Sequence, residues 1–351
     1  MERACRKVGL RFGVYVSPWD RNSIHYATEK YVDIYHAQIK ELLSGDYGEV
    51  FEMWFDGANG GDGWYGGAAG PKGERRKIGA GYYRFPEVFR FVRELQPRVC
   101  IFSGENDASD YRWPGNERGV LDPDSRATIE TVGGFSTHGA GYGNPNYKGM
   151  INTGAAHGEF FRMCEADFPL RPGWFYHAAE DGKTKSAAYL TKLYLSTVGN
   201  GGTMNIGVAP NKSGVLADED VRALRGFGVL RQALFARPVT QPETPFNVVL
   251  LREDLSHGEQ ADGWEVRADG QTILSGKSIG NKRIRVLPKM CMAKRVEVVV
   301  TKDGGELRPV TMELFRADPS LVETVTRATT ESGETDTAKW MTASEEGAQG
   351  K

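Results

Sequence analysis

The chain is poor in cysteine, and its four cysteines show none of the spacings that bind zinc. Cys5, Cys100, Cys164 and Cys291 are scattered singly, and no C-x-x-C pair occurs. Free cysteines among apolar neighbours behave as small buried hydrophobic residues. We therefore expect four buried thiols and no metal site, and the cysteines leave the compartment open.

A long apolar run and an excess of charge of one sign are also absent from the sequence. No apolar run approaches the roughly 18 residues that a membrane span needs, and 44 basic against 46 acidic residues give a formal net charge of −2. A nucleic-acid-binding chain would carry a basic patch. The sequence therefore predicts neither a membrane nor a nucleic acid as a partner, and residues 1–20 lack the pattern of a signal peptide.

What the sequence has in excess is glycine, with 44 in 351 residues. The glycines cluster at 57–70, 133–145 and 199–202, in segments that also carry Trp, Tyr or Asn. None of these segments has a G-x-G-x-x-G or G-x-x-x-x-G-K pattern between a strand and a helix, so we expect no nucleotide cofactor. Loops of this composition are typical of sites where a polar ligand approaches the backbone closely.

Strand and helix patterns alternate through the first two thirds of the chain. Val32, Tyr35 and Ile39 recur at helical spacing, and Pro86 suits the first turn of a helix that ends before Pro97. The predicted strands are 10–17, 49–56, 98–104 and 203–210, and the predicted helices are 29–44, 85–97, 182–202 and 217–235. Because polar and aromatic residues follow the strand ends, this alternation predicts an α/β fold of the (β/α)-barrel type over residues 1–237.

The pattern changes after Pro238. Six short strands follow, rich in Val, Leu and Ile and separated by turns that contain Gly, Asp, Asn or Lys. They predict a C-terminal β-sandwich over residues 238–317. Residues 318–351 are rich in Thr, Glu, Ser and Gly and show no periodicity, so we expect a disordered tail there.

The predicted strand EVFEMWFD ends by presenting a carboxylate. Its residues alternate between two sets, Phe51, Met53 and Phe55 on one side and Glu52, Trp54 and Asp56 on the other. The apolar set is expected to face the surrounding helices. Asp56 then faces the interior at the C-terminal mouth of the barrel, where barrel enzymes place catalytic groups. The alternative is a turn or helix-capping aspartate before Gly57.

A second carboxylate, Glu117, lies in the segment 109–119 together with Arg112 and Trp113. Taken alone it would be a surface residue, and Glu105, after the preceding strand, is its rival. Two carboxylates above a barrel mouth rich in Trp and Tyr suit a glycosidase, because aromatic faces stack on sugars and carboxyl groups serve as acid, base or nucleophile.

Six segments of the chain together carry a family signature. They read FGVYVSPWDRN (12–22), VFEMWFDGANG (50–60), RWPGNERG (112–119), EADFPLRPGWFYH (165–177), GVAPNKSGVLADEDVRALRGFG (207–228) and GWEVRADGQTILSGKSIGNKRI (263–284). In this order, along residues 3–317, they resemble the α-L-fucosidases of glycoside hydrolase family 29. The resemblance implies a (β/α)8 TIM-type barrel followed by a β-sandwich, and retaining hydrolysis of α-linked L-fucose.

By this resemblance Asp56 is the catalytic nucleophile, since it matches the aspartate of the family's W-F-D-G motif. Glu117 matches the glutamate of the G-N-E motif, the acid/base of the branch specific for α-1,3/1,4-linked fucose, and Asn59 also favours that branch. Trp174 matches an aromatic residue that lines the sugar pocket. Further residues in the matching segments, expected to bind substrate, are Trp19, Asp20, Trp54, Arg112 and Trp113.

One family feature is missing from the sequence. Family members carry a pair of adjacent histidines in earlier strand–helix units, whereas none of the six histidines here adjoins another. We therefore expect a barrel that lacks its first strand–helix units, as in an N-terminally truncated product, and weak activity of this chain on its own. The resemblance also implies a periplasmic or secreted protein whose partner is a fucosylated oligosaccharide or glycoconjugate.

Two other functions remain open on the sequence. The first is a retaining glycosidase of the same fold that acts on another sugar. The second is a non-catalytic carbohydrate-binding fragment, in which the β-sandwich would bind the sugar. Residues 238–317 hold only three aromatic residues, Phe246, Trp264 and Phe315, and Trp264 is expected in the core, which argues against the second function.

Overall fold

The computed structural model of the protein describes residues 1–20, 22–56, 76, 78–79, 81–102, 109–130, 151–302 and 308–330. The chain forms two compact units, which are considered separately. The first unit comprises residues 1–113, 130–151 and 158–162, and the second comprises residues 114–129, 152–157 and 163–351. The glycine-rich segments 57–70 and 133–145, and Glu105, lie outside the described residues.

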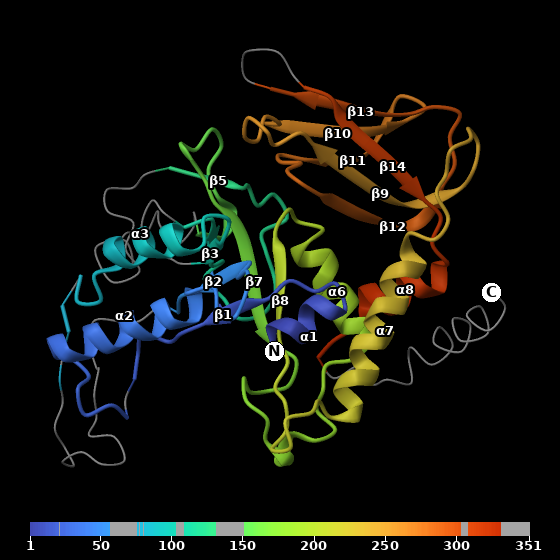
Figure 1. Ribbon diagram of the computed structural model, residues 1–351. Coiled ribbons are helices and arrows are strands. Elements are labelled where there is room, and N and C mark those ends of the chain that lie inside the picture. Colours follow the sequence, from blue (N-terminus) through green and yellow to red (C-terminus); the bar gives the residue numbers. More distant parts are fainter. Residues whose placement is uncertain are drawn as a thin grey trace. The chain divides into compact units, whose positions relative to one another are not determined.

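The first unit is built on parallel strands in the order β1, β2, β3 and β4, of which Figure 1 labels the first three. Its strands are β1 (Gly13–Tyr15), β2 (Glu52–Trp54), β3 (Cys100–Phe102), β4 (Tyr111–Arg112) and the separate β6 (Phe160–Phe161), and its helices are α1 (Glu2–Lys7), α2 (Glu29–Leu43) and α3 (Phe85–Leu95). The predicted strands and helices of this part are confirmed, although their ends are shorter. Pro86 stands in the first turn of α3, as expected.

The helices α2 and α3 pack against one face of these strands. Met53 of β2 and Ile101 of β3 are in register and fully buried, and they share a core with Ile39 of α2 and Phe89 of α3. Phe55, just after β2, contacts Phe89 with ring centroids 5.2 Å apart. The predicted alternation of β2 is therefore confirmed for its apolar side, because Met53 and Phe55 both face the helices.

The second unit begins with the short strand β5 (Thr128–Ile129) and the parallel pair β7 (Met163–Pro169) and β8 (Thr203–Gly207). A 3₁₀ helix, η1 (Ala178–Glu180), precedes the helices α6 (Ala187–Thr197) and α7 (Asp218–Leu234). The predicted helix start at 182 is wrong. Ser186 accepts a hydrogen bond from the amide of Tyr189 and caps α6, so residues 182–185 belong to a loop.

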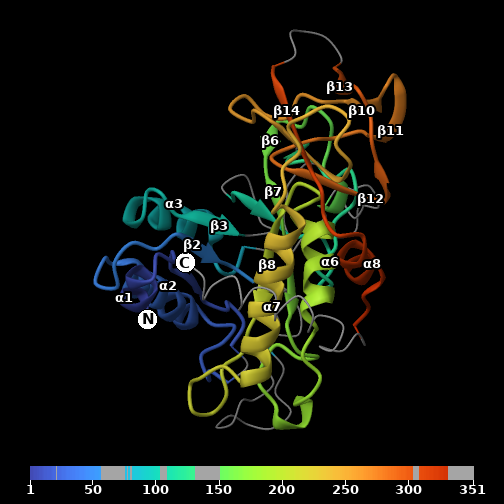
Figure 2. The same ribbon diagram turned by 90° about the vertical axis from the view of Figure 1, so that its right-hand side faces the viewer.

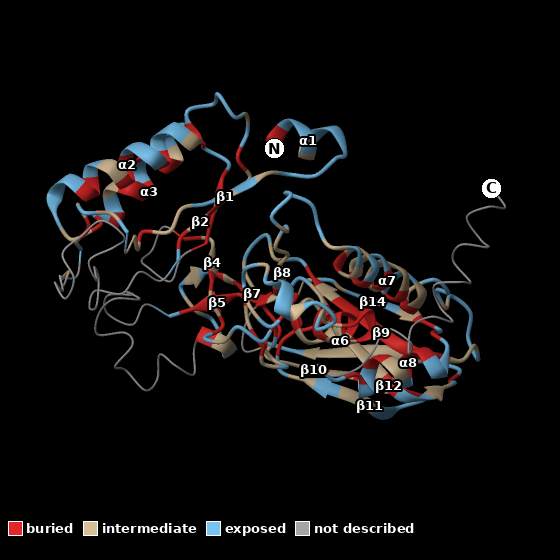
Figure 3. Ribbon diagram, turned by 90° about the horizontal axis from the view of Figure 1, so that it is seen from below, coloured by how far each residue is buried: buried red, intermediate tan, exposed pale blue. Residues whose placement is uncertain are grey.

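The six strands predicted after Pro238 are present, and they form two antiparallel three-stranded sheets. They are β9 (Phe246–Glu253), β10 (Gly263–Ala268), β11 (Gln271–Gly276), β12 (Arg283–Cys291), β13 (Val296–Thr301) and β14 (Val310–Phe315). The sheet orders are β12-β9-β14 and β11-β10-β13, and their facing sides share one apolar core around Val249, Leu251, Trp264 and Val266. Figure 3 shows the central strand β9 buried along most of its length and the edge strand β11 largely exposed or half-buried.

The other side of the sheet β12-β9-β14 packs against helices. Val248 and Leu250 of β9 share a core with Leu230 of α7 and Leu321 of α8 (Pro319–Arg327), and α6, α7 and α8 lie side by side (Figure 2). Residues on α6 and α7 thus share a core with a strand of the sandwich. The expected boundary at residue 237 stays a prediction, since the structure groups these elements in one unit.

Two predictions made from composition are wrong. The tail is not disordered over residues 319–327, because α8 buries Leu321, Val322 and Val325 on one face; residues 331–351 lie outside the described part. All four cysteines are free thiols, but only Cys164 is buried and the other three are half-buried. Cys5 lies on the short helix α1 and is only half-buried. Its apolar neighbours in the sequence could not reveal this, because burial depends on what packs against the helix.

Candidate functional site

Three aromatic side chains form a row across the C-terminal ends of β1, β2 and β3. Tyr15, Trp54 and Phe102 are in register on adjacent parallel strands, so their side chains point to the same face. Trp54 stacks on Phe102 with centroids 4.1 Å apart and planes 4° from parallel, and Tyr15 lies 5.3 Å from Trp54. This face is opposite to the one covered by α2 and α3, as the alternation of β2 predicted.

Asp56 follows this row and is exposed. The hydroxyl of Tyr15 donates a hydrogen bond to its Oδ2 at 2.6 Å, and the amide of Phe55 donates to the carbonyl of Phe102 at 3.0 Å, which fixes the end of β2. Burial raises the pKa of Tyr15 well above its ordinary value, and the hydrogen bond and charge of Asp56 raise it further. The phenol therefore stays a donor, and it orients the carboxylate.

Trp19 and Asp20 have structural contacts in the same unit. Trp19 is half-buried and packs against the apolar core under α2. Oδ1 of Asp20 accepts hydrogen bonds from the amides of Asn22 and Ser23 at 2.8 and 3.0 Å, which is a turn role. Their expected contact with a sugar stays a prediction.

Arg112 is buried, with an exposed fraction of 2%. Its Nε donates to the carbonyl of Ile151 at 2.9 Å and its Nη1 to the carbonyl of Arg162. A guanidinium so enclosed ties distant backbone segments together, and the adjacent Trp113 is half-buried. The structure thus gives Arg112 a structural role, and substrate binding by Arg112 and Trp113 stays a prediction.

In the second unit, Glu117 and Trp174 are brought together. Nε1 of Trp174 donates to Oε2 of the exposed Glu117 at 3.2 Å. Trp174 rests on the backbone of Gly207 at the end of β8, where a Cβ would lie only 2.7 Å from two ring carbons. Asn116 shapes the loop that carries Glu117. Its Nδ2 donates a hydrogen bond to the carbonyl of Val120 at 3.1 Å, and its Oδ1 accepts one from the amide of Arg118 at 3.1 Å.

Sequence reasoning missed two buried carboxylates on β7. Glu165 and Asp167 are 5% and 6% exposed, and they lie in register with Thr203 and Asn205 of β8. Glu165 accepts hydrogen bonds from Asn205 at 3.0 Å and Thr203 at 3.3 Å. The signal was the alternation of polar and apolar residues in CEADF beside TMNIG, the same alternation that identified Asp56. Tyr15 was missed in the same way.

Within the part of the chain that the structure describes, no group of three or more His, Cys, Asp or Glu side chains could hold a metal ion. Among the same residues, no helix is long and apolar enough to cross a membrane. The arrangement offers carboxylates, an oriented phenol and aromatic faces, which suit carbohydrate chemistry.

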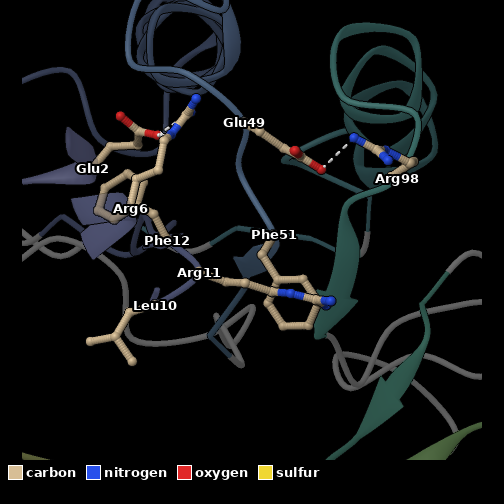
Figure 4. A pocket seen from close by; sticks show the side chains of 8 residues that line it. All are labelled: Glu2, Arg6, Leu10, Arg11, Phe12, Glu49, Phe51 and Arg98. Atoms are coloured by element: carbon tan, nitrogen blue, oxygen red, sulfur yellow. Dashed lines mark hydrogen bonds and ion pairs between the residues drawn. The ribbon is translucent and has the colours of Figure 1, made fainter. Parts of the chain in front are cut away.

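A pocket of about 400 Å³ opens at the other end of β1, β2 and β3, away from Asp56 (Figure 4). Its walls contain the ion pair Arg98–Glu49, at 2.9 Å, and Arg11 over the ring of Phe51. The lining residues are Glu2, Arg6, Leu10, Arg11, Phe12, Glu49, Phe51 and Arg98. In parallel barrels the catalytic groups lie at the C-terminal ends of the strands, so this pocket is not the candidate site.

Comparison with known proteins places this geometry in a family. Alpha-L-fucosidase 1 of Arabidopsis thaliana is 27% identical over 353 residues, 85% of this chain and 64% of its own length. A rice relative (Oryza sativa subsp. japonica), whose name also refers to the alpha-L-fucosidases, is 34% identical over 240 residues, 67% of this chain and 40% of its own. The chain thus spans less than two thirds of the length of either relative.

A solved structure gives the same result. The crystal structure of a glycoside hydrolase 29 family member from an unknown rumen bacterium matches 90% of this chain and 59% of its own, with a TM-score of 0.76 and 30% identity. This likeness and the parallel strands with their helices fit an α/β barrel-like domain, followed by antiparallel sheets. The family model named Alpha-L-fucosidase matches residues 1–231, and the chain therefore belongs to the alpha-L-fucosidase family.

Proposed function

We propose that the chain carries the catalytic carboxylates of a retaining α-L-fucosidase, with Asp56 as nucleophile and Glu117 as acid/base. The observation that supports it most is the carboxylate of Asp56 at the C-terminal end of β2, oriented by Tyr15 beside an aromatic row, in a chain of this family. The substrate would be a fucosylated oligosaccharide or glycoconjugate. The α-1,3/1,4 linkage preference and a periplasmic or secreted location belong to the same proposal.

In the first step Asp56 attacks the anomeric carbon of fucose, and the bond from that carbon to the leaving oxygen breaks. Glu117 donates its proton to that oxygen. In the second step Glu117 removes a proton from water, the water oxygen bonds to the anomeric carbon, and the fucosyl–aspartate ester breaks. Two displacements retain the configuration at the anomeric carbon.

The aromatic row provides the sugar-binding face. Trp54, stacked on Phe102, presents a rigid surface on which the apolar side of fucose, including its methyl group, can pack. Glu117 lies with Trp174, whose indole bonds to the carboxyl group and leaves the other oxygen, Oε1, for the leaving group. The methyl group of this deoxy sugar matches a site that offers an apolar aromatic face.

The test is the hydrolysis of 4-nitrophenyl α-L-fucoside by the purified chain and by Asp56→Ala. We expect Asp56→Ala to lose activity by a factor on the order of 10³ or more, as nucleophile removal does, and azide to restore turnover only in that variant. Asp46→Ala is the matched control, since Asp46 is an exposed aspartate whose carboxylate accepts a hydrogen bond from the hydroxyl of Ser44 at 3.2 Å. Full activity of Asp56→Ala would refute the assignment.

Aryl glycosides of other sugars, assayed in the same way, separate fucose from its competitors. The alternative function, a non-catalytic carbohydrate-binding fragment, has little support, because the three aromatic residues of the sandwich are buried. Trp264 is 2% exposed and donates its indole N–H to the carbonyl of Ser278 at 2.9 Å. A sandwich with no exposed aromatic face has no stacking platform for a sugar.

A further inference from the structure

The loop from Leu170 to Lys185 is attached to α7 by contacts that centre on a buried arginine. The side chain of Arg171 is 2% exposed and meets three carboxylates. Its Nε lies 2.9 Å from Oδ2 of Asp220, its Nη1 2.9 Å from Asp181 and its Nη2 2.5 Å from Glu219. The ring of Tyr176 covers the guanidinium at 4.9 Å.

The same carboxylates hold the far side of the loop. Oε2 of Glu219 accepts from the amide of Gly182 at 2.8 Å, and Oδ1 of Asp220 accepts from the hydroxyl of Thr184 at 2.7 Å. Glu219 and Asp220 belong to the first turn of α7. Arg171 is therefore the centre of a clamp that fixes both ends of the loop to one rigid helix.

The loop carries Trp174, three residues after Arg171. The amide of Leu170 bonds to the carbonyl of Gly207 at 2.9 Å, so the loop starts directly against the end of β8. Trp174 then folds back onto Gly207 and donates to Glu117. The indole is 38% exposed, so packing alone does not fix it, and the anchoring of its loop sets where its N–H points.

We propose that Arg171 is a positioning residue that acts through Trp174 to orient the carboxyl group of Glu117. The inference rests on the proposed function for its consequence in catalysis, but the contact itself is independent of activity. Lysine cannot replace Arg171, because an ammonium group lacks the planar set of five N–H donors that reaches carboxylates in three directions. Loss of the guanidinium releases the loop, and Trp174 leaves Glu117.

The contact is measured by NMR of the indole N–H groups in the ¹⁵N-labelled chain. The sequence has seven tryptophans, and the signal of Trp174 is the one lost in Trp174→Phe. In the wild type the position of this signal should change with pH, because the carboxyl group of Glu117 accepts the hydrogen bond of the indole. In Glu117→Gln the position should no longer depend on pH. In Arg171→Lys we expect the signal at a new position with no pH dependence.

A signal of Trp174 that stays in place and still follows pH in folded Arg171→Lys would refute the proposal, as would one that ignores Glu117→Gln. Should the lysine variant not fold, Glu219→Gln replaces it, since it removes one carboxylate of the clamp; an unshifted signal there refutes the proposal equally. Asp218→Asn, in the same turn of α7 but exposed, is the control that should leave the signal unchanged.

Activity then tests the consequence for catalysis. With a fucosylated oligosaccharide, whose leaving group needs a proton, Arg171→Lys should lower kcat by roughly tenfold or more, a part of the ~10²–10⁴ that a general acid contributes. With 2,4-dinitrophenyl α-L-fucoside, whose leaving group needs none, the rate should change less than about twofold. Equal losses on both substrates would mean a merely structural role.

A double-mutant comparison completes the test. Arg171→Lys should have no further effect on kcat in a Trp174→Phe background, because the path through the indole is already lost; additive effects would contradict it. If the wild type hydrolyses neither substrate, the proposed function fails, while the NMR result still decides the clamp.

Discussion

The hydroxyl of Tyr15, on β1, lies 2.6 Å from Oδ2 of Asp56, which follows β2. The register that places Tyr15 beside Trp54 brings the phenol to the end of the neighbouring strand. The hydrogen bond holds Oδ2 of Asp56, and in the proposed mechanism Oδ1 is the oxygen that attacks. Asp56, which the sequence predicted as a site residue, is thus oriented by Tyr15, which the sequence analysis did not identify.

Tyr15→Phe removes the hydroxyl and keeps the ring against Trp54. A hydrogen bond to a charged group contributes about 1.5–3 kcal/mol, so we expect kcat/KM on an aryl fucoside to fall roughly ten- to hundredfold. The thermal midpoint should change little, because Tyr15 is 52% exposed. Tyr47→Phe is the matched control: Tyr47 is an exposed tyrosine that donates to a carboxylate, Glu41, at 3.4 Å, and its loss should leave activity unchanged.

Glu259 makes the stability of the second unit depend on pH. Its Oε2 is buried and has no hydrogen-bond partner among the described residues. Burial raises the pKa of Glu259 above its ordinary value, and the negative charge of Glu253 raises it further. A hydrogen bond from the backbone of Ala127 and the positive charges of Arg283 and Arg126 lower it, but by less. The folded state therefore holds the proton more tightly than the unfolded state. The contribution of this proton to the stability of the folded state is fully present below the ordinary carboxyl pKa, which applies to the unfolded chain. It is lost as the pH rises through the raised pKa of the folded state.

We expect Glu259→Gln to remove this dependence, so that the thermal midpoint of the wild type falls relative to the variant as pH rises from about 4 to 7. Glu265→Gln gives the opposite sign. Hydrogen bonds from Thr272 and Arg267 lower the pKa of Glu265, so the wild type should gain relative to that variant over the same range. Parallel midpoints of the wild type and Glu259→Gln at every pH would contradict the account.

Sequence patterns predicted those strands and helices in which one face packs against one neighbouring layer, because such packing leaves a regular alternation of apolar residues in the sequence. The alternation of β2 is confirmed because one face meets α2 and α3. The start of α3 (Phe85–Leu95) was predicted because proline suits the first turn of a helix, and Pro86 stands there. The clamp around Arg171 joins residues 48 and 49 positions apart in sequence, and no local pattern records such a partner. The structural contacts of Arg112 could not be predicted for the same reason, because its carbonyl partners are 39 and 50 residues away.

The helix α8 was missed although it carried a local signal. Asp318 accepts a hydrogen bond from the amide of Ser320 at 2.8 Å, and Pro319 occupies the first turn, a helix start that the Thr- and Glu-rich composition obscured. The helix is short, and it forms because the second unit offers an apolar face to cover. Composition describes a tail in water, whereas packing against this face decides its structure.

Docking of α8 is tested by Leu321→Ala. Leu321 is fully buried with residues of α7 and β9, so truncation should lower the free energy of unfolding by about 2–5 kcal/mol. Urea denaturation monitored by circular dichroism measures it. The control is Glu323→Ala on the exposed side of the helix, which loses only a surface pair with Arg327 and should cost no more than about 1 kcal/mol. A negligible change in Leu321→Ala would mean that the helix does not dock.

Gly207→Ala tests the seat of Trp174 without touching any charged group. A Cβ at this position would lie 2.7 Å from Cε3 and Cζ3 of Trp174, a distance that forces the ring to move. We expect the indole signal of Trp174 to move to a new position, as in Arg171→Lys, and the free energy of unfolding to fall by about 1–3 kcal/mol. The NMR spectrum and the urea midpoint report the two effects.

Gly228→Ala is the control for the same chemical change. Gly228 lies inside α7, and nothing stands within 4 Å of the Cβ that it would gain. This substitution should stabilise the chain by roughly 0.5–1 kcal/mol, because alanine favours a helix interior over glycine. It should leave the signal of Trp174 in place. If Gly207→Ala behaved in the same way, the ring would not rest on β8, and the path from the clamp to Glu117 would lack its support.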